Sequence, residues 1–342
     1  MRPLETLLPT ETLEIENGLS LVPRLKLLLT IHPSLPSVSK PIDEWQLKRA
    51  LTDFLKTSLS VTITVPEEDL LIRRVKDLKK RKREDPVAHG TLFIYDLGFL
   101  SGGKRREDDD EKEEDVKEVE KKFLDWRRYI VEKMDGIELN LEGVRYKLSV
   151  EIPISDDFER MKKDWEEFYA FRNRGCPRGG KQEPDTIVLR GVPSRWFAEP
   201  RVSSKPSMLV THTTFSSFGK IRNLNVAEDN DFGKDVNHDE MDLISGLNCK
   251  IVVQFEKYKD FYNALKVLCS HSLQKQGSQL KSDYEVTWDK DGLFRNSRSE
   301  SQGKSGRIQE KETVRYRSEA PRRETYVSEF APDDTRRKRF KE

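Results

Sequence analysis

Residues 184–197 read PDTIVLRGVPSRWF, and the apolar, β-branched part of this stretch predicts a strand over residues 185–192. Working outward from it, the pattern predicts a helix at 207–218 ended by Gly219, strands at 220–226 and 247–255, a helix at 257–270 and a strand at 283–289. The order is β-α-β-β-α-β, which is the ferredoxin-like arrangement.

The same order is predicted upstream. Strands are expected at 19–32, 60–65, 91–100 and 146–154, with helices at 41–57 and 116–134. The fold class that follows is α+β, with two tandem ferredoxin-like β-α-β-β-α-β modules of the RNA-recognition-motif (RRM) type, charged insertions and a disordered C-terminal tail.

The expected boundaries follow from composition. They are a flexible leader (1–18), an N-terminal RRM-like module (19–155), a helix with a Gly/Pro linker (156–183), an RRM domain (184–291) and a disordered basic tail (292–342). Two charge blocks, at 73–85 and 104–115, are predicted to be insertions in the first module, because blocks of like charge rarely pack.

Bulk properties narrow the class of protein. Hydrophobic residues make up 35% of the 342 residues and charged residues 36%, so part of the chain is expected to be solvated. The three cysteines, Cys176, Cys249 and Cys269, are scattered, which fits a reducing compartment rather than a disulfide framework. No apolar run reaches the length of a bilayer span, so we expect a soluble intracellular protein with no membrane partner.

The stretch 184–197 also resembles a signature of the A-kinase anchor protein 17A family, which is also called the arginine/serine-rich splicing factor 17A family. Further matches are FSSFGKIRN at 215–223, FEKY at 255–258 and PIDEW at 41–45. The resemblance implies a nuclear, splicing-associated, RNA-binding protein. Family members carry a long charged helical region and an arginine/serine-rich tail after the RRM. The printed chain stops at Glu342, so we do not expect kinase anchoring from it.

The second sheet lacks the aromatic side chains with which an RRM usually stacks on bases. Val188, Lys250 and Val252 occupy the three positions where such rings are common. The face is instead modestly basic, so we predict phosphate-driven binding of single-stranded RNA, with pre-mRNA the expected form. The residues predicted to contact RNA are Val188, Arg190, Arg195, Arg222, Lys250, Val252 and Gln254.

Alternatives remain open at this point. The same sheet can serve as a protein-interaction scaffold that never touches RNA, and the first module is expected to be a pseudo-RRM used for structure or protein contact. Trp196 and Phe197 are either a stacking pair displaced into a loop or anchors in the core. Splicing-associated proteins are the expected protein partners.

Two basic runs suit nuclear import, because import receptors bind clustered Lys and Arg. They are Lys79, Lys80, Arg81, Lys82 and Arg83, and Arg336, Arg337, Lys338 and Arg339. The alternative for each is a solvated charge block. No motif for catalysis, a metal, a cofactor or a small-molecule substrate is found; the calcium-like acidic spacing from Asp229 has Lys234 where a glycine is required. We therefore expect a non-enzyme with no cofactor.

Overall fold

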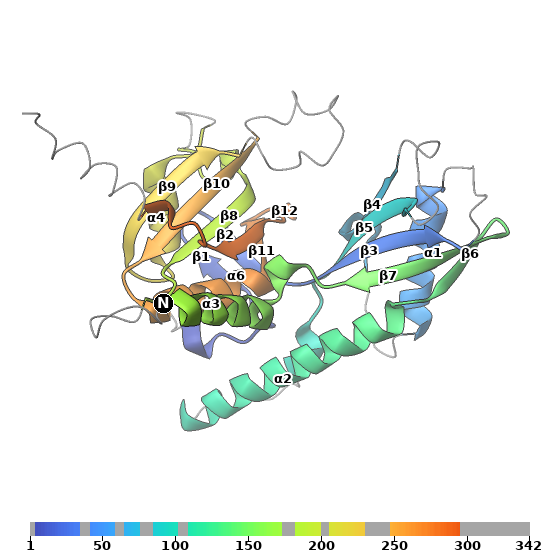
Figure 1. The fold of residues 1–342 in the computed structure, drawn as a ribbon, viewed down its shortest axis with the longest axis horizontal. Helices are drawn as coiled ribbons and strands as arrows, with labels where there is room; N and C mark the ends of the chain where they lie inside the picture. Colours follow the sequence, from blue (N-terminus) through green and yellow to red (C-terminus); the bar gives the residue numbers. More distant parts are fainter. Residues whose placement is uncertain are drawn as a thin grey trace, which may run out of the picture. The chain divides into compact units, whose positions relative to one another are not determined.

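The computed structural model describes residues 4–34, 42–58, 65–75, 85–101, 109–172, 182–199, 205–229 and 247–294; for 109–115 it describes the backbone alone. Within these ranges three antiparallel sheets are present (Figure 1). No helix in the described ranges is long and apolar enough to cross a membrane.

The second predicted module forms a four-stranded sheet in the order β13-β8-β10-β9. Its strands are β8 (Thr186–Pro193), β9 (Ile221–Glu228), β10 (Asn248–Phe255) and β13 (Glu285–Trp288), and its helices are α4 (Met208–Ser216) and α6 (Tyr258–Ser270). Every neighbouring pair is antiparallel. Chain order β-α-β-β-α-β with the first and third strands in the centre is the ferredoxin-like topology, so this prediction is confirmed.

Local sequence explains these elements. Alternate residues of β10, namely Cys249, Ile251 and Val253, point into one buried core, and the residues between them point to the opposite face. Helix α6 buries residues such as Phe261 at helical spacing against that core. Ser207 caps the N-terminus of helix α4, because its hydroxyl accepts a hydrogen bond from the N–H of Leu209 at 3.2 Å.

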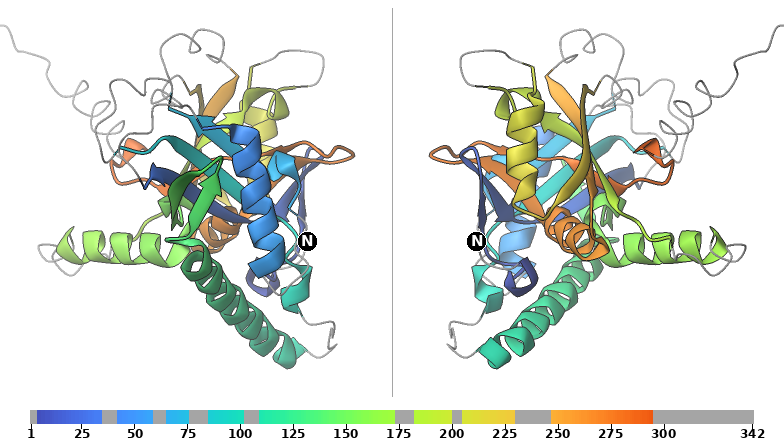
Figure 2. Two further views of the ribbon diagram at one scale, coloured as in Figure 1. Left: turned by 90° about the vertical axis from the view of Figure 1, so that its right-hand side faces the viewer. Right: turned by 90° about the vertical axis from the view of Figure 1, so that its left-hand side faces the viewer.

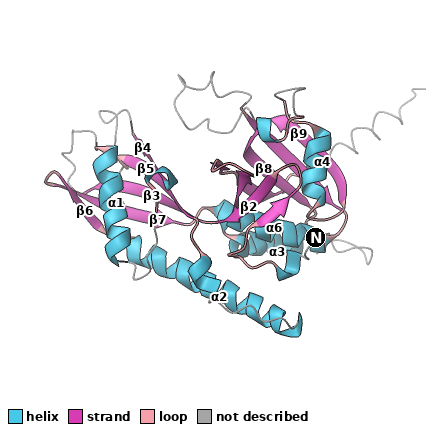
Figure 3. Ribbon diagram, turned by 180° about the vertical axis from the view of Figure 1, so that it is seen from behind, coloured by secondary structure: helices cyan, strands magenta, loops and turns pink. Residues whose placement is uncertain are grey.

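The first predicted module forms a five-stranded sheet in the order β4-β5-β3-β7-β6. Its elements are β3 (Leu25–Pro33), α1 (Glu44–Ser58), β4 (Leu70–Arg74), β5 (Ala88–Ile94), α2 (Asp109–Met134), β6 (Glu138–Leu141) and β7 (Val144–Glu151). Apart from the added edge strand β6, this is again β-α-β-β-α-β, as predicted. Figure 3 shows α1 across one face of this sheet.

Several boundaries in the first module differ from prediction. The predicted strand at 60–65 lies outside the described residues except for Val65, and the second strand is β4, after Pro66. The basic block at 73–85 is therefore not wholly an insertion, because Arg73 and Arg74 belong to β4. The acidic block at 104–115 is not wholly an insertion either, since α2 already begins at Asp109.

A third sheet joins the two ends of the described chain. Its order is β1-β2-β11-β12, with β1 (Leu13–Ile15), β2 (Leu19–Pro23), β11 (His271–Lys275) and β12 (Lys281–Ser282). Leu21 of β2 pairs with Leu273 of β11. The expected flexible leader is thus wrong for residues 13–18, and the single strand predicted at 19–32 is two strands in two sheets.

Helix α3 (Phe158–Arg172) belongs to the core of the second module. Trp165 is 2% exposed and packs edge-on against Phe261 of α6, with 5.6 Å between ring centroids. Leu19 and Leu21 from β2 join the same core. Both views in Figure 2 show α3 (green) beginning beside α6 (orange). The predicted helix therefore exists, and it packs in the core of the second module as well as joining the two modules; residues 173–181 of the Gly/Pro segment and the tail from residue 295 lie outside the described residues.

Candidate nucleic-acid interface

The helix-free face of the second sheet is the place where RNA contact was predicted. Strand register places Val188 beside Val252 and Thr287, and Gln254 beside Thr186 and Asn223. None of these side chains belongs to the core cluster under the helices. Val188, Arg190, Lys250, Val252 and Gln254 therefore share the outer face on which the sequence placed them.

A β-bulge brings two cations together on this face. Leu189 pairs with Ile251 and Val192 with Cys249, so Arg190 and Gly191 together lie opposite Lys250. Gly191 has φ +76°, a left-handed conformation that costs other residues energy. Arg190 and Lys250 are both half-buried on the outer face, so the bulge sets two positive charges side by side.

The carboxylate of Asp229 holds this bulge in place. Its Oδ2 accepts a hydrogen bond from the N–H of Gly191 at 3.2 Å, and its own N–H donates to the carbonyl of Asn248 at 3.0 Å. Asp229 is 7% exposed. The acidic spacing that starts at this residue, already rejected as a calcium loop because of Lys234, lies otherwise outside the described residues. No group of three potential metal ligands occurs in the described ranges.

The predicted cations make no side-chain ion pair or hydrogen bond within the part of the chain that the structure describes. This holds for Arg190, Arg195, Arg222 and Lys250, whereas Lys220 pairs with Glu256 at 3.0 Å. Glu285 lies opposite Arg190 on β13, but their charged atoms are not in ion-pair contact. Unpaired guanidinium and ammonium groups are the groups that phosphate oxygens can engage.

The four cations do not form one patch. Arg195 follows the end of β8 at Pro193, which pairs with Asn248, so it lies at the same end of the sheet as Arg190 and Lys250. Arg222 sits at a register irregularity near the start of β9, opposite the other end of β10. Ala227 is the β9 partner of Lys250, which places Arg222 about 16 Å away along the strand.

The centre of the outer face of the second sheet is uncharged and has little solvent-exposed surface. Val188 is 7% exposed, Val252 3% and Gln254 5%. The amide of Gln254 donates to Asp185 at 2.8 Å and accepts from Asn223, so its polar atoms are already engaged. Of the predicted RNA residues, these three offer little surface or hydrogen-bonding capacity.

Trp196 and Phe197 behave as core anchors. Phe197 is fully buried and stacks on Phe215 of α4, with 6.1 Å between centroids and 19° between planes, while Trp196 packs against the same core. Of the two interpretations left open by the sequence, the structure supports this one. The two import runs, 79–83 and 336–339, lie outside the described residues.

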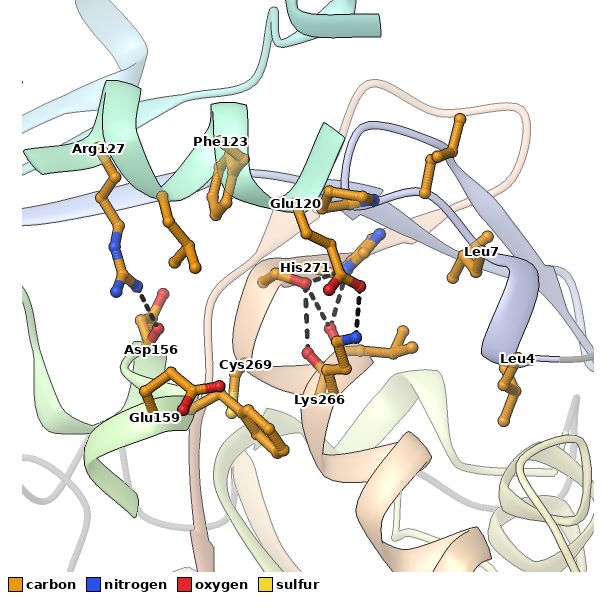
Figure 4. Close-up of a pocket in the computed structure, with 16 residues that line it drawn as sticks. Leu4, Leu7, Glu120, Phe123, Arg127, Asp156, Glu159, Lys266, Cys269 and His271 are labelled. Carbon is orange, nitrogen blue, oxygen red and sulfur yellow. Dashed lines mark hydrogen bonds and ion pairs between the residues drawn. The ribbon is translucent and has the colours of Figure 1, made fainter. Parts of the chain in front are cut away.

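The structure also has a pocket that the sequence did not indicate (Figure 4). It lies between the N-terminal segment with η1 (Leu4–Thr6), helix α2 and helix α6, and Phe123 supplies part of its apolar lining. Two of its cations are engaged by acids: Lys266 pairs with Glu120, and Arg127 with Asp157 at 3.3 Å. These pairs leave neither cation free to bind a phosphate.

This chain is similar to proteins that are already known. The sequence model of a family described as "AKAP-17A-like, RNA-binding domain" matches residues 118–327, more than half of the chain. The chain belongs to this family. The matched region begins within α2 and contains α3 and every strand of the second sheet, which agrees with the packing of α3 as part of that module.

The chain is also similar to the curated human protein A-kinase anchor protein 17A. It is 29% identical over 154 residues, which is 44% of this chain and 22% of that protein. The chain therefore spans about a fifth of the length of this relative. A crystal structure of the three N-terminal RNA-binding domains of the yeast splicing factor Prp24 also matches, at 15% identity over 78% of this chain and 67% of that one. Its TM-score is 0.18, so the fold rests on the strand order above.

The bulge is the feature that sequence reasoning missed at this site. A glycine inside an apolar strand is a known signal of a bulge or of close backbone approach, and Gly191 provided it. The position of Arg222 at the far end of the face had no comparable signal, because it depends on register.

Proposed function

We propose that this AKAP-17A-like chain binds single-stranded RNA, with pre-mRNA the expected form, and acts in the nucleus as an accessory factor in splicing or mRNA processing. The observation that carries the proposal is the pair Arg190 and Lys250, set side by side by the Gly191 bulge without a carboxylate partner in the described ranges. Arg195 extends the same end of the sheet. The family name supports RNA as the ligand.

The chemistry of this face supports a particular mode of binding. Stacking on aromatic rings contributes about 1–3 kcal/mol per base in other single-strand binders, and two valines and a lysine occupy those positions here. Binding therefore depends on phosphate contacts from cations at one end of the sheet. Such contacts are weakly sequence-selective and weaken as salt rises, because counterions are released when phosphates are neutralised.

The alternative function is a scaffold that uses the same fold for protein contact. It is favoured by the burial of Val188 and Val252 in the centre of the face, which leaves few atoms there for a nucleic-acid base. Splicing-associated proteins are the proposed partners in either case. Nuclear import through the runs 79–83 and 336–339 also stays a proposal, and charge-neutralising substitution of each run in a fluorescent fusion tests it.

Binding of the full chain to a labelled, mixed-sequence single-stranded RNA tests the proposal. Fluorescence anisotropy is measured at several salt concentrations for the wild type, for Arg190→Ala/Lys250→Ala, and for the control Lys163→Ala/Lys257→Ala. The control removes two exposed lysines on α3 and at the start of α6, so both variants change the net charge equally.

The expected result is about a tenfold loss of affinity at low salt for Arg190→Ala/Lys250→Ala and a salt slope smaller by about 1.4, because two phosphate contacts are lost. The control should bind like the wild type. Equal affinity of both variants for RNA would show that RNA does not bind to this face, and it would favour the scaffold function.

A further inference from the structure

The first sheet has its own helix-free face, and one end of that face is open. Core residues Leu27, Leu29 and Ile31 of β3 face helices α1 and α2, so the residues between them face the other way. Leu28 is 37% exposed on this outer face, and Leu71 of β4 is 49% exposed.

Polar side chains from four strands line up across the open end. Arg73 of β4 pairs in register with His89 of β5, His89 with Thr30 of β3, and Thr30 with Ser149 of β7. At the strand spacing of a sheet, this row is about 14 Å wide. Lys147 lies on β7 two residues before Ser149, and therefore on the same face.

The charge of this end is mainly positive. Arg73, His89 and Lys147 are exposed, and none of them makes a side-chain ion pair or hydrogen bond in the described ranges. Two acids share this face: Glu138 of β6 is the register partner of Lys147 and lies 3.9 Å from Arg145, and Glu151 lies at the far end of β7.

The other end of the same face is closed by the second module. Lys26 pairs with Asp283 at 2.5 Å, and Lys281 lies over the ring of Tyr95, 3.5 Å from its centroid. Phe93, an outward aromatic residue of β5, is 6% exposed and lies under the guanidinium of Arg24 at 5.9 Å. A ligand can therefore reach the cationic row and the two leucines, but not the aromatic ring.

We propose that this open end, formed by Arg73, His89, Thr30, Ser149 and Lys147, is a second contact surface for single-stranded RNA. The row presents hydrogen-bond donors and positive charge to phosphate and ribose oxygens. Leu28 and Leu71, which both pair with Thr91 in the adjacent row, give the bases an apolar surface. A protein partner fits less well, because a stable protein interface needs a larger apolar centre than two exposed leucines supply.

This inference extends the proposed function to a different surface, so its test must keep the two surfaces apart. The full chain is compared with Arg73→Glu/Lys147→Glu and with the control Lys56→Glu/Lys133→Glu. The control reverses two exposed lysines on the helix side of the same module, on α1 and α2. Circular dichroism and thermal unfolding check that each variant is folded, and Arg73→Gln/Lys147→Gln replaces the first variant if it is not.

Two readouts decide the result. Anisotropy with the labelled RNA is expected to show at least about a fivefold larger loss of affinity for Arg73→Glu/Lys147→Glu than for the control. Photo-crosslinking with 4-thiouridine RNA is expected to label wild-type peptides from β3, β5 or β7, and the label should be lost in the variant. Affinity equal to the control, with no crosslinks to these strands, would overturn the inference.

The result for Arg190→Ala/Lys250→Ala on the second sheet can be told apart from the result for Arg73→Glu/Lys147→Glu on the first sheet. If Arg190→Ala/Lys250→Ala binds RNA normally while Arg73→Glu/Lys147→Glu does not, the proposed face is wrong and the inference stands. If only Arg190→Ala/Lys250→Ala loses binding, the proposed function stands and the inference is overturned.

Discussion

Nη2 of Arg24 lies 3.1 Å from Oδ2 of Asp156, and neither side chain is accessible to solvent beyond 6% of its surface. Arg24 stands between β2 and β3, where the chain passes from the third sheet to the first, and Asp156 lies just before α3. The same guanidinium pairs with Asp283, donates to the hydroxyl of Ser272 at 2.7 Å and packs over the ring of Tyr284. One buried cation thus links segments from both ends of the described chain.

Replacement of Arg24 should be strongly destabilising. Arg24→Ala leaves Asp156 buried without its cation, and breaking a buried pair in this way costs about 3–5 kcal/mol. Burial raises the pKa of Asp156, while the positive charge of Arg24 opposes that rise. The measurement is the urea midpoint of the full chain. Arg74→Ala, which removes an exposed pair with Glu44, is the matched control and should cost less than about 1 kcal/mol.

Stability should fall between neutral pH and pH 4 through His271. Burial lowers its pKa to about 4, although hydrogen bonds to the carbonyls of Glu11 and Val267 oppose this shift. The unfolded chain, with an ordinary histidine pKa of about 6.5, therefore takes up a proton before the folded chain does. Unfolding is favoured by up to about 3 kcal/mol as pH drops through this window.

His271→Gln isolates that contribution. Its side-chain amide can still donate to the Glu11 carbonyl, which lies 3.0 Å from Nε2 of the histidine, but it does not titrate. Urea unfolding at neutral pH and just above the folded-state pKa should show a smaller acid-induced loss in this variant. An identical loss in both proteins would assign the acid sensitivity to carboxylates instead.

Gly191→Ala should weaken RNA binding as well as stability. A side chain at φ +76° costs about 1–2 kcal/mol, and relief of this strain would shift Arg190 relative to Lys250. Gly143 in the β6–β7 turn has φ +82° and open space around it, so Gly143→Ala imposes similar strain far from the site. Thermal unfolding should report comparable losses, whereas anisotropy should report weaker RNA binding for Gly191→Ala alone.

A fragment with the predicted RRM boundaries, 184–291, should be far less stable than the full chain. It lacks Leu19, Leu21 and Trp165, three side chains that are almost fully buried in the core of that module. Burial of large apolar side chains is worth roughly 1.5–3 kcal/mol each. Calorimetry of the fragment and of the full chain provides the comparison; an equal melting temperature would contradict a stabilising contribution from β2 and α3.

The alternation of single strands made both ferredoxin-like passes predictable. Val188, Lys250 and Val252 were placed on the outer face because a strand has a period of two residues. The predictions that were wrong concern pairing between strands that lie far apart in the sequence. The residues Leu19 and Leu21 have the same sequence pattern whether their strand continues into β3 or ends and pairs with β11. The sequence of β2 alone does not show which of the two occurs, because β11 lies about 250 residues later.

The residues on the outer face of the second sheet were also predictable only in part. The residue types showed that stacking aromatics are missing and that cations remain. Sequence alone could not show that Gln254 is engaged by Asp185 and Asn223, nor that Arg222 lies at the far end of the sheet. The open face of the first sheet was missed because its row of donors assembles from four strands, each contributing one ordinary polar residue.

The pairing of β2 with β11 also fixes an order of events during synthesis. On the ribosome, β2 emerges first, yet its partner strand follows about 250 residues later, a delay of roughly 12–50 s at ordinary rates of translation. During that interval β2 can pair only with β1, and the edge of β2 that later pairs with β11 is exposed to proteases and chaperones. Removal of the codons for β2 would therefore destabilise a module whose own sheet is encoded much later in the chain.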